Sequence, residues 1–349
     1  MSASLGAPQG VPTLTDVARV AGVSLATADR VVNRRAGVRP ATIARVEAAV
    51  AALGFERHAG AADLARRVRH RVTAVLPSGG NPFMRRLGEE LSRAARLLGA
   101  RRLDLTLAAA ETLRPTRLAE AIEAAAGLSD AVVAVGLDDP LVAAAIDAAA
   151  ARGVPVITLV SDVPGSRRSR YVGIDNRAAG RVAGSLVGRF LGPEPAEVAV
   201  LLGSRALRDH RDRLDGFAAV LGERFPHLRL AGVWEGEDDP VRARAAVAEL
   251  LAAHPRIAAV YSAGAGNVGL ARALEDAGSQ ACVVAHELTA ETRPLIERGA
   301  VDALIAQDAG HEARSALRLA LAQLSGTRID ESQERIRIEI LLRDNLPEA

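Results

Sequence analysis

Most of this chain alternates short apolar runs with stretches of helical spacing, and this alternation constrains its fold more than any other feature. After residue 71, runs rich in β-branched residues are separated by stretches in which apolar residues recur at helical spacing. A helix between two such runs returns the chain to the sheet in the same direction, so the pattern predicts parallel sheets covered on both faces. The eight runs are VTAVL, LDLTLA, AVVAVG, VPVITLV, EVAVLL, IAAVYS, CVVAHE and DALIAQ.

The N-terminal segment has a different pattern, which predicts three short helices. Thr13 is expected to cap a helix that ends at Gly22, and Ser24 to cap a second helix after a tight turn. Pro40 suits the first position of a third helix, which Gly54 ends. Three helices in so short a segment are typical of a helix-turn-helix domain.

Charge is distributed unevenly between these two parts. Residues 1–71 hold 11 Arg against 5 acidic residues, a net charge of +6, in a chain whose formal net charge is +2. The remaining residues therefore carry a net charge of −4. A basic head favours a polyanionic partner, because neutralising phosphates releases their counterions.

The second helix of a helix-turn-helix domain lies in the major groove of DNA, and its first exposed side chains contact base edges. Arg30 can pair with guanine, while Thr27 and Asn33 suit phosphate contacts. Phosphates repel the carboxylate of Asp29, unless it accepts from cytosine or holds Arg30 in place. The alternative is a helical hairpin with solvated arginines. The residues expected to contact DNA in this segment are Thr15, Ser24, Leu25, Ala26, Thr27, Asp29, Arg30 and Asn33.

The stretch TLTDVARVAGVSLATADRVVN, followed by VRPATIARVEAAVAALGF and AADLARR, resembles the N-terminus of LacI-type transcriptional regulators. The resemblance implies a DNA-binding domain over residues 13–58, after a disordered tail at 1–12. It also implies a hinge helix or linker over residues 59–71 that forms on operator DNA. In such a hinge Leu64 is a wedge that opens a base step in the minor groove.

The sequence departs from that family at several positions. Asp29 stands where a serine is usual, and Arg39 stands where a serine normally caps the third helix. Arg57 and His58 replace a common Pro-Asn pair before the hinge, and Gly60 adds a residue that weakens helices. These changes predict a hinge helix that is weaker, or more dependent on DNA, than is usual in the family.

Polar and aromatic residues follow the predicted strands, at the sheet edge where ligands bind in folds of this kind. Carboxylates, amides and guanidinium groups beside an aromatic ring suit a ligand with many hydroxyls. Residues 72 to about 342 also resemble the two-lobed effector domain of the same regulators, in which NPF, the arginine of R-x-x-G-F, an acid and a glutamine contact the ligand. The residues expected to bind the effector are Asn81, Phe83, Ser161, Asp162, Arg211, Arg213, Ser262, Glu287 and Gln307.

A nucleotide-binding motif competes with this interpretation. Residues 264–269 read GAGNVG, follow a predicted strand and open a helix, and Glu287 comes 18 residues after Gly269. This is the context of a dinucleotide site, in which a helix N-terminus holds pyrophosphate and an acid binds ribose. Such a unit usually opens its domain, however, and here it follows the sixth predicted strand.

Enzyme and membrane signals are weak. His286 and His311 each precede a glutamate, as in zinc-binding helices, but neither has a second histidine four residues on. The single Cys282 lies in an apolar run, and His210 stands among charged residues and is expected on the surface. The sequence contains no lysine, so a phosphate-binding loop that needs one is excluded. No apolar run reaches the roughly 18–20 residues of a membrane helix, and the first twelve residues lack a signal-peptide pattern.

Together these features predict a small all-α helix-turn-helix head and a two-lobed α/β body of the type I periplasmic-binding-protein kind at residues 72–349. We expect a homodimeric cytoplasmic repressor, without catalytic activity, metal or cofactor. Its partners are a palindromic operator in double-stranded DNA and a sugar or polyol effector. Two alternatives stay open: a solute-binding protein for sugars, and a regulator that senses NAD(H) through residues 264–269.

Overall fold

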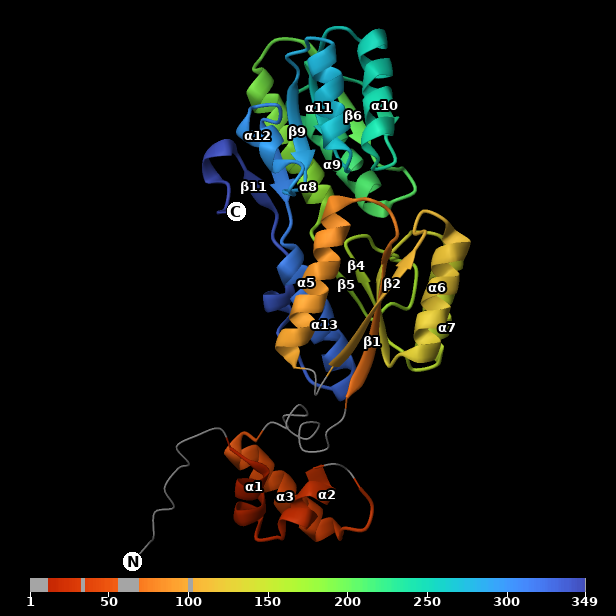
Figure 1. Cartoon of the computed structure of the whole chain (residues 1–349). Coiled ribbons are helices and arrows are strands. Elements are labelled where there is room, and N and C mark those ends of the chain that lie inside the picture. The colour runs from red at the N-terminus through yellow and green to blue at the C-terminus, as the bar shows by residue number, and fades with distance from the viewer. Residues whose placement is uncertain (1–11, 33–34, 56–68, 100–102, 349) are drawn as a thin grey trace, which may run out of the picture. The chain divides into compact units, whose positions relative to one another are not determined.

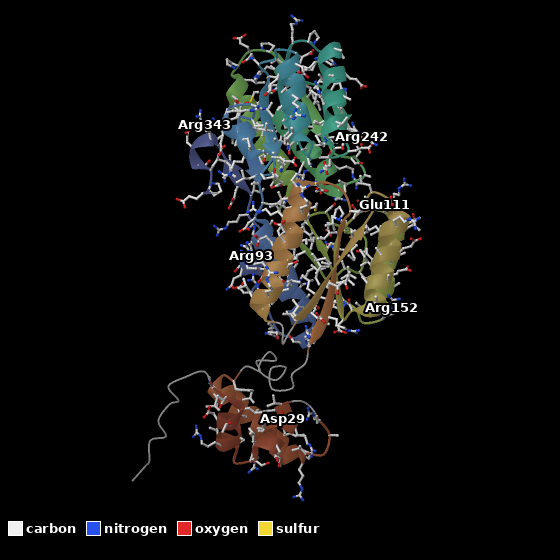
Figure 2. All side chains as sticks on the ribbon, viewed as in Figure 1. Asp29, Arg93, Glu111, Arg152, Arg242 and Arg343 are labelled. Atoms are coloured by element: carbon white, nitrogen blue, oxygen red, sulfur yellow. The ribbon has the colours of Figure 1, made fainter. Side chains whose placement is uncertain are left out.

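The computed structural model describes residues 12–32, 35–55, 69–99 and 103–348. The chain divides between residues 66 and 67 into two compact units (Figure 1). In the larger unit, charged side chains such as those of Arg93 on α5 and Arg152 after α7 project into solvent (Figure 2). Within the described ranges, every helix is too short or too polar to cross a bilayer.

The first unit contains the three predicted helices, and their ends are those that the caps predict. Thr13 caps the first through a capping box with Asp16, and Gly22 ends it with a left-handed φ of 61°. Gly54, with a φ of 60°, ends the third. Val17, Val31 and Val46, among others, are buried between the helices. The helices are α1 (Leu14–Ala21), α2 (Leu25–Val32) and α3 (Pro40–Leu53).

The second unit has two lobes, each built on a sheet. The sheet of the first lobe is parallel and has the strand order β2-β1-β3-β4-β5. Helices α5 and α13 pack together on one face of this sheet, and α6 and α7 pack together on the other. The strands are β1 (His70–Pro77), β2 (Leu103–Ala110), β3 (Ala131–Val135), β4 (Val156–Leu159) and β5 (Arg170–Val172). The helices are α5 (Pro82–Leu98), α6 (Pro115–Leu128), α7 (Pro140–Ala151) and α13 (Ala309–Ser325).

The second lobe repeats this plan with the strand order β11-β10-β9-β8-β6-β7, in which only β11 is antiparallel. Helices α8 and α9 cover one face, and α10 to α12 cover the other. The strands are β6 (Ala196–Leu202), β7 (Leu228–Glu235), β8 (Ile257–Ser262), β9 (Cys282–His286), β10 (Ala303–Ala306) and β11 (Glu339–Leu341). The helices are α8 (Asn176–Leu191), α9 (Arg208–Arg224), α10 (Pro240–Ala253), α11 (Asn267–Asp276), α12 (Arg293–Glu297) and the short 3-10 turns η1 (Glu331–Glu334) and η2 (Arg343–Asn345).

The predicted fold class is confirmed, with parallel sheets in both lobes. The eight predicted runs correspond to β1 to β4, β6 and β8 to β10. The structure adds β5, β7 and β11. The chain passes between the lobes after β5, after β10 and after α13, so the carboxyl ends of both parallel sheets face one cleft.

Candidate functional site

Helix α2 of the first unit exposes one face to solvent. Ser24 caps the helix, because its Oγ accepts from the Thr27 amide at 3.2 Å. Leu25 is 52% exposed, and Ala26 and Arg30 are also exposed. The opposite face is buried against α1 and α3. A short helix with small and basic groups on its free face fits the major groove of DNA.

Other residues predicted to contact DNA lie around this face. Thr15 is exposed on α1. The Asp29 carboxylate accepts from Arg35 Nη1 at 3.3 Å, so it is neutralised in part. Arg39 precedes α3 without a side-chain capping bond, as its identity predicts. Asn33, Leu64 and the rest of the predicted hinge lie outside the described residues.

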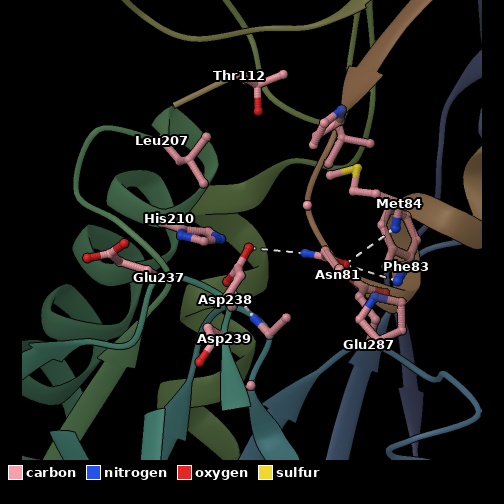
Figure 3. A pocket seen from close by; sticks show the side chains of 18 of the residues that line it. Asn81, Phe83, Met84, Thr112, Leu207, His210, Glu237, Asp238, Asp239 and Glu287 are labelled. Carbon is pink, nitrogen blue, oxygen red and sulfur yellow. Dashed lines mark hydrogen bonds between the residues drawn. The ribbon is translucent and has the colours of Figure 1, made fainter. Parts of the chain in front are cut away.

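The cleft of the second unit encloses a cavity of about 480 Å³ (Figure 3). Such a volume suits a small metabolite. The structure brings most of the predicted effector-binding residues to its walls, although they lie far apart in the sequence. Those that line the cavity are Asn81, Phe83, Ser161, Arg213, Glu287 and Gln307.

A buried cluster forms the floor of the cleft. Arg213 Nε donates to Asn176 Oδ1 at 2.8 Å and Nη1 to the Ala263 carbonyl at 2.9 Å. Glu287 accepts from the backbone amide and from Nε2 of Gln307, both at 2.9 Å. Burial raises the pKa of Glu287 to about 7, against the opposing effect of Arg213 and these two hydrogen bonds. Glu287 therefore changes its charge near neutral pH.

The wall from the first lobe is built by the start of α5. Asn81 caps this helix, because its Oδ1 accepts from the amides of Phe83 and Met84 at 3.0 and 3.3 Å. Its Nδ2 donates to Asp238 Oδ2 of the other lobe at 3.0 Å, across the cleft (Figure 3). Phe83 is buried in the wall and carries the one benzene ring among the described lining residues. A flat apolar group beside hydrogen-bonding side chains is suited to a sugar ring.

Three predicted residues do not line the cavity. Asp162 is turned away into an ion pair with Arg168, whose Nη2 donates at 2.7 Å. Arg211 Nη2 donates to Asp138 Oδ2 of the other lobe at 2.7 Å, so it bridges the lobes instead of pointing into the cavity. Ser262 is the last residue of β8 and is fully buried beneath the cavity. Asp162 follows β4 and Ser262 ends β8, as predicted, whereas Arg211 lies within α9, and none of the three side chains points into the cavity.

Several lining residues were not predicted. His210 was expected on the surface but is 3% exposed, and its Nδ1 accepts from the Ser204 amide at 3.1 Å. Asp209 lines the floor one helical turn before Arg213, a spacing on α9 that could have indicated it. Asp238 follows β7, which was not predicted as a strand, so no sequence signal directed attention to it. Asn267 and His286 also line the cavity.

The glycine-rich loop at residues 264–269 is used for packing within the protein. The Ala265 amide, which would be free to bind a pyrophosphate, donates to Asp238 Oδ1 at 2.8 Å. A Cβ on Gly264 would lie 2.6 Å from the same oxygen, and one on Gly269 would meet the Pro240 carbonyl. Glu287, the expected ribose ligand, is bonded to Gln307. The groups expected to bind a nucleotide are therefore already bonded within the protein, which argues against the nucleotide interpretation.

Comparisons with known proteins divide the chain in the same way as its fold. Residues 72–328 match the family model described as "Periplasmic binding protein domain", and residues 13–58 match "Bacterial regulatory proteins, lacI family". The first match alone covers more than half of the chain.

Named relatives include regulators. The chain is 26% identical over 258 residues to the HTH-type transcriptional regulator GalS of Salmonella typhimurium strain LT2, which covers 72% of this chain and 71% of GalS. It is 35% identical over 82 residues to the ribose operon repressor of Escherichia coli K12, covering 24% of this chain and 25% of that protein. The second unit has the fold of GanP, a glucose-galactose binding protein from Geobacillus stearothermophilus. The TM-score is 0.72 at 21% identity, over 80% of this chain and all of GanP.

Proposed function

This chain belongs to the lacI family of bacterial regulatory proteins and carries a periplasmic binding protein domain, and from that membership we propose that it is a transcriptional repressor. Its head binds a specific operator, and its second unit binds a small polar effector, a sugar or polyol. The relatives GalS and the ribose operon repressor are named as regulators, which supports this assignment. We assign no catalytic role, and an operator-binding protein acts in the cytoplasm.

The observation that carries the proposal is the polar cleft in a chain that also has a helix-turn-helix head. The cleft combines Arg213, Glu287 and Gln307 on its floor with the ring of Phe83 on its wall. The three polar groups have hydrogen-bonding partners that hold them in place before a ligand arrives. Such a prearranged polar site favours ligands with several hydroxyls.

Contacts across the cleft indicate how a ligand affects the second unit. Asp138 of the first lobe accepts from Arg211 of the second, and Arg85 on α5 lies 3.5 Å from Glu291. A ligand that binds between the lobes stabilises the arrangement that makes these contacts. Operator affinity then changes by the difference in the ligand's affinity for the two states.

For the DNA side, we propose that the free face of α2 contacts base edges and that Arg30 reads a guanine. We propose that the DNA-binding domain spans residues 13–58, the hinge residues 59–71 and the effector domain residues 72–349. Asn33 and the Leu64 wedge stay predictions. A palindromic operator has twofold symmetry, so we propose a homodimer that presents two α2 helices to it.

The test is operator binding by the purified full-length protein. We expect fluorescence anisotropy at physiological salt to give much tighter binding to a palindrome from the protein's own locus than to a scrambled duplex, with a sugar or polyol changing that affinity. Equal affinity for both duplexes contradicts the proposal. A sugar-binding protein without DNA preference would then support the solute-binding alternative, and a thermal shift with NAD(H) but not with sugars would support the nucleotide alternative.

A further inference from the structure

The floor of the cleft carries more buried negative charge than its buried guanidinium can balance. Asp209 and Glu287, which line the cavity, are 5% and 7% exposed, and Glu312, which does not line it but acts on Glu287 electrostatically, is 0% exposed. Arg213, at 3%, is the one buried arginine among the residues that the structure describes. Removing three carboxylates from water beside a single cation is unfavourable unless protons or another cation supply the difference.

Arg213 is also committed to partners within the protein. Its Nε and Nη1 are bonded to Asn176 and to the Ala263 carbonyl, and its Nη2 lies 3.8 Å from Glu287 Oε1. A guanidinium held on these sides builds the floor of the site. Its Nη2 is beyond hydrogen-bond distance of Glu287, so among the described contacts this nitrogen keeps donors for a ligand.

Acidic side chains also outnumber arginines at the rim of the cleft. Arg242 pairs with Glu237. Arg114 Nε lies 2.8 Å from Glu111 Oε2, and Arg85 lies 3.5 Å from Glu291. Asp238 and Asp239 line the cavity as well, so the whole cleft carries an excess of acidic side chains.

The buried atoms without a partner in the cleft point to a ligand that donates hydrogen bonds. Asp209 Oδ1, Gln307 Oε1 and Asn267 Oδ1 have no hydrogen-bond partner, and their residues are 5%, 6% and 4% exposed. All three atoms can only accept, whereas two other unpartnered atoms of the lining, Ser161 Oγ and His286 Nδ1, can each donate or accept. The donors of the same amides are already used, since Gln307 Nε2 bonds Glu287 and Asn267 Nδ2 bonds the His286 carbonyl at 2.7 Å.

The buried His286 does not supply the missing positive charge. Burial, followed by the charge of Arg213, holds the pKa of His286 well below its usual range. Nδ1 of His210 accepts from the Ser204 amide, and its Nε2 lies 3.7 Å from Asp209 Oδ2. Burial raises the pKa of Glu287 to about 7 and that of Glu312 well above its usual range, so a proton neutralises Glu312 and a bound cation competes with a proton at Glu287.

A hydroxyl group donates one hydrogen bond and brings no charge, whereas an ammonium group donates three and offsets a carboxylate. Resting on the proposed function, we propose that the effector is an amino sugar or an amino polyol. Its ammonium group binds beside Asp209 and Glu287, and its hydroxyls take the remaining acceptors.

The test compares matched pairs of ligands on the wild-type, full-length protein by isothermal titration calorimetry at neutral pH. The pairs are D-glucosamine with D-glucose, D-galactosamine with D-galactose, and 1-amino-1-deoxysorbitol with sorbitol. We expect at least one aminated compound to bind about tenfold or more tightly than its neutral partner, because a charge-assisted hydrogen bond is stronger than a neutral one.

A pair of variants connects this preference to the floor. We expect Asp209→Asn to remove most of the preference for the aminated compound. Asp215→Asn, on the exposed side of the same helix α9, should leave that preference unchanged. Thermal unfolding shows whether Asp209→Asn is folded, and if it is not, the wild-type comparison of matched pairs decides alone.

Three outcomes overturn the inference: neutral sugars that bind as tightly as their aminated partners, no binding of any aminated compound at millimolar concentration, or a preference that survives in a folded Asp209→Asn variant. None of these affects operator recognition. The proposed function fails separately, when the protein without ligand does not distinguish its palindrome from a scrambled duplex.

Discussion

The head and the cleft both depend on arginine, but they hold it in different surroundings. Arg30 is exposed on α2, whereas Arg213 is 3% exposed and bonded on several sides. An exposed guanidinium keeps its hydrogen bonds for a partner molecule, and its removal from the free protein costs little. A buried guanidinium that balances carboxylates is needed for the stability of the folded state. The same residue type therefore contributes to DNA binding in one unit and to stability in the other.

The largest predicted effect tests the buried side of this comparison. Arg213→Met keeps the volume of the side chain but leaves Glu287 and Asp209 without their cation. Breaking a buried ion pair from one side costs about 3–5 kcal/mol, so we expect the free energy of unfolding to fall by that amount. Urea unfolding of the full-length protein measures it.

Arg205→Met is the matched control for this substitution. Arg205 is exposed and pairs with Glu235 on the surface. We expect a much smaller change in its urea midpoint, because solvent screens exposed pairs. Similar losses in both variants would contradict the distinction between buried and exposed arginine.

The second prediction uses pH to test the floor. The folded pKa of Glu287 is about 7, above the roughly 4.3 of an unfolded glutamate. The folded state therefore binds the proton more tightly, and stability falls as pH rises from about 4.3 towards 7 and levels off above it. Glu287→Gln removes this dependence, so its stability relative to the wild type should be greater at pH 8 than at pH 5.

The groups that face Glu287 must be considered in this measurement. They are Arg213 and Asp209 on α9, Gln307 after β10, His286 on β9 and Glu312 on α13. The wild type and the Glu287→Gln variant share all of these neighbours. The difference between the urea midpoints of the two proteins, measured at pH 5 and at pH 8, therefore isolates the contribution of Glu287. Glu249→Gln, exposed on α10, should follow the wild type at both pH values. A constant difference across the pH range would show that Glu287 does not titrate there.

The third prediction tests the exposed side. Arg30→Ala should weaken operator binding by about 1–3 kcal/mol and relax sequence preference at one base pair, while the urea midpoint stays near that of the wild type. Anisotropy titrations on the operator and on random DNA measure both effects. An equal loss on the two duplexes would assign Arg30 to a phosphate. Arg93→Ala, exposed on α5 in the other unit, is the control and should change neither affinity.

The two units also differ in how much of them the sequence could predict. Most of the predicted helix ends in the head lie at residues that act on their own neighbours: Thr13 on Asp16, Ser24 on Thr27 and Gly22 through its φ. Such signals are local, so they can be recognised in the sequence alone. The predicted starts of the three helices and the ends of α1 and α3 were therefore accurate.

In the cleft, the missing information is long-range. Strand β7 was not predicted because it is an edge strand of mixed polarity, and Asp238, which follows it, was missed as a result. Asp162 and Ser262 were placed correctly along the chain, but the direction of a side chain depends on partners such as Arg168 that no local pattern specifies. Arg213 and Glu287 were found by their positions after predicted strands, and the family resemblance supported them.

The smallest predicted effect tests whether the local signals of the head carry energy. Ser24→Ala removes the cap of α2, whose Oγ accepts from the Thr27 amide. Losing such a cap costs about 1 kcal/mol, so the amides of α2 should exchange with deuterium faster in the variant, while those of α13 in the second unit should not change. Thr15→Ala, exposed on α1, is the control and should leave the exchange of α2 unchanged. If Ser24→Ala also leaves it unchanged, the head is held by its core of Val17, Val31 and Val46, and the caps only mark where its helices begin.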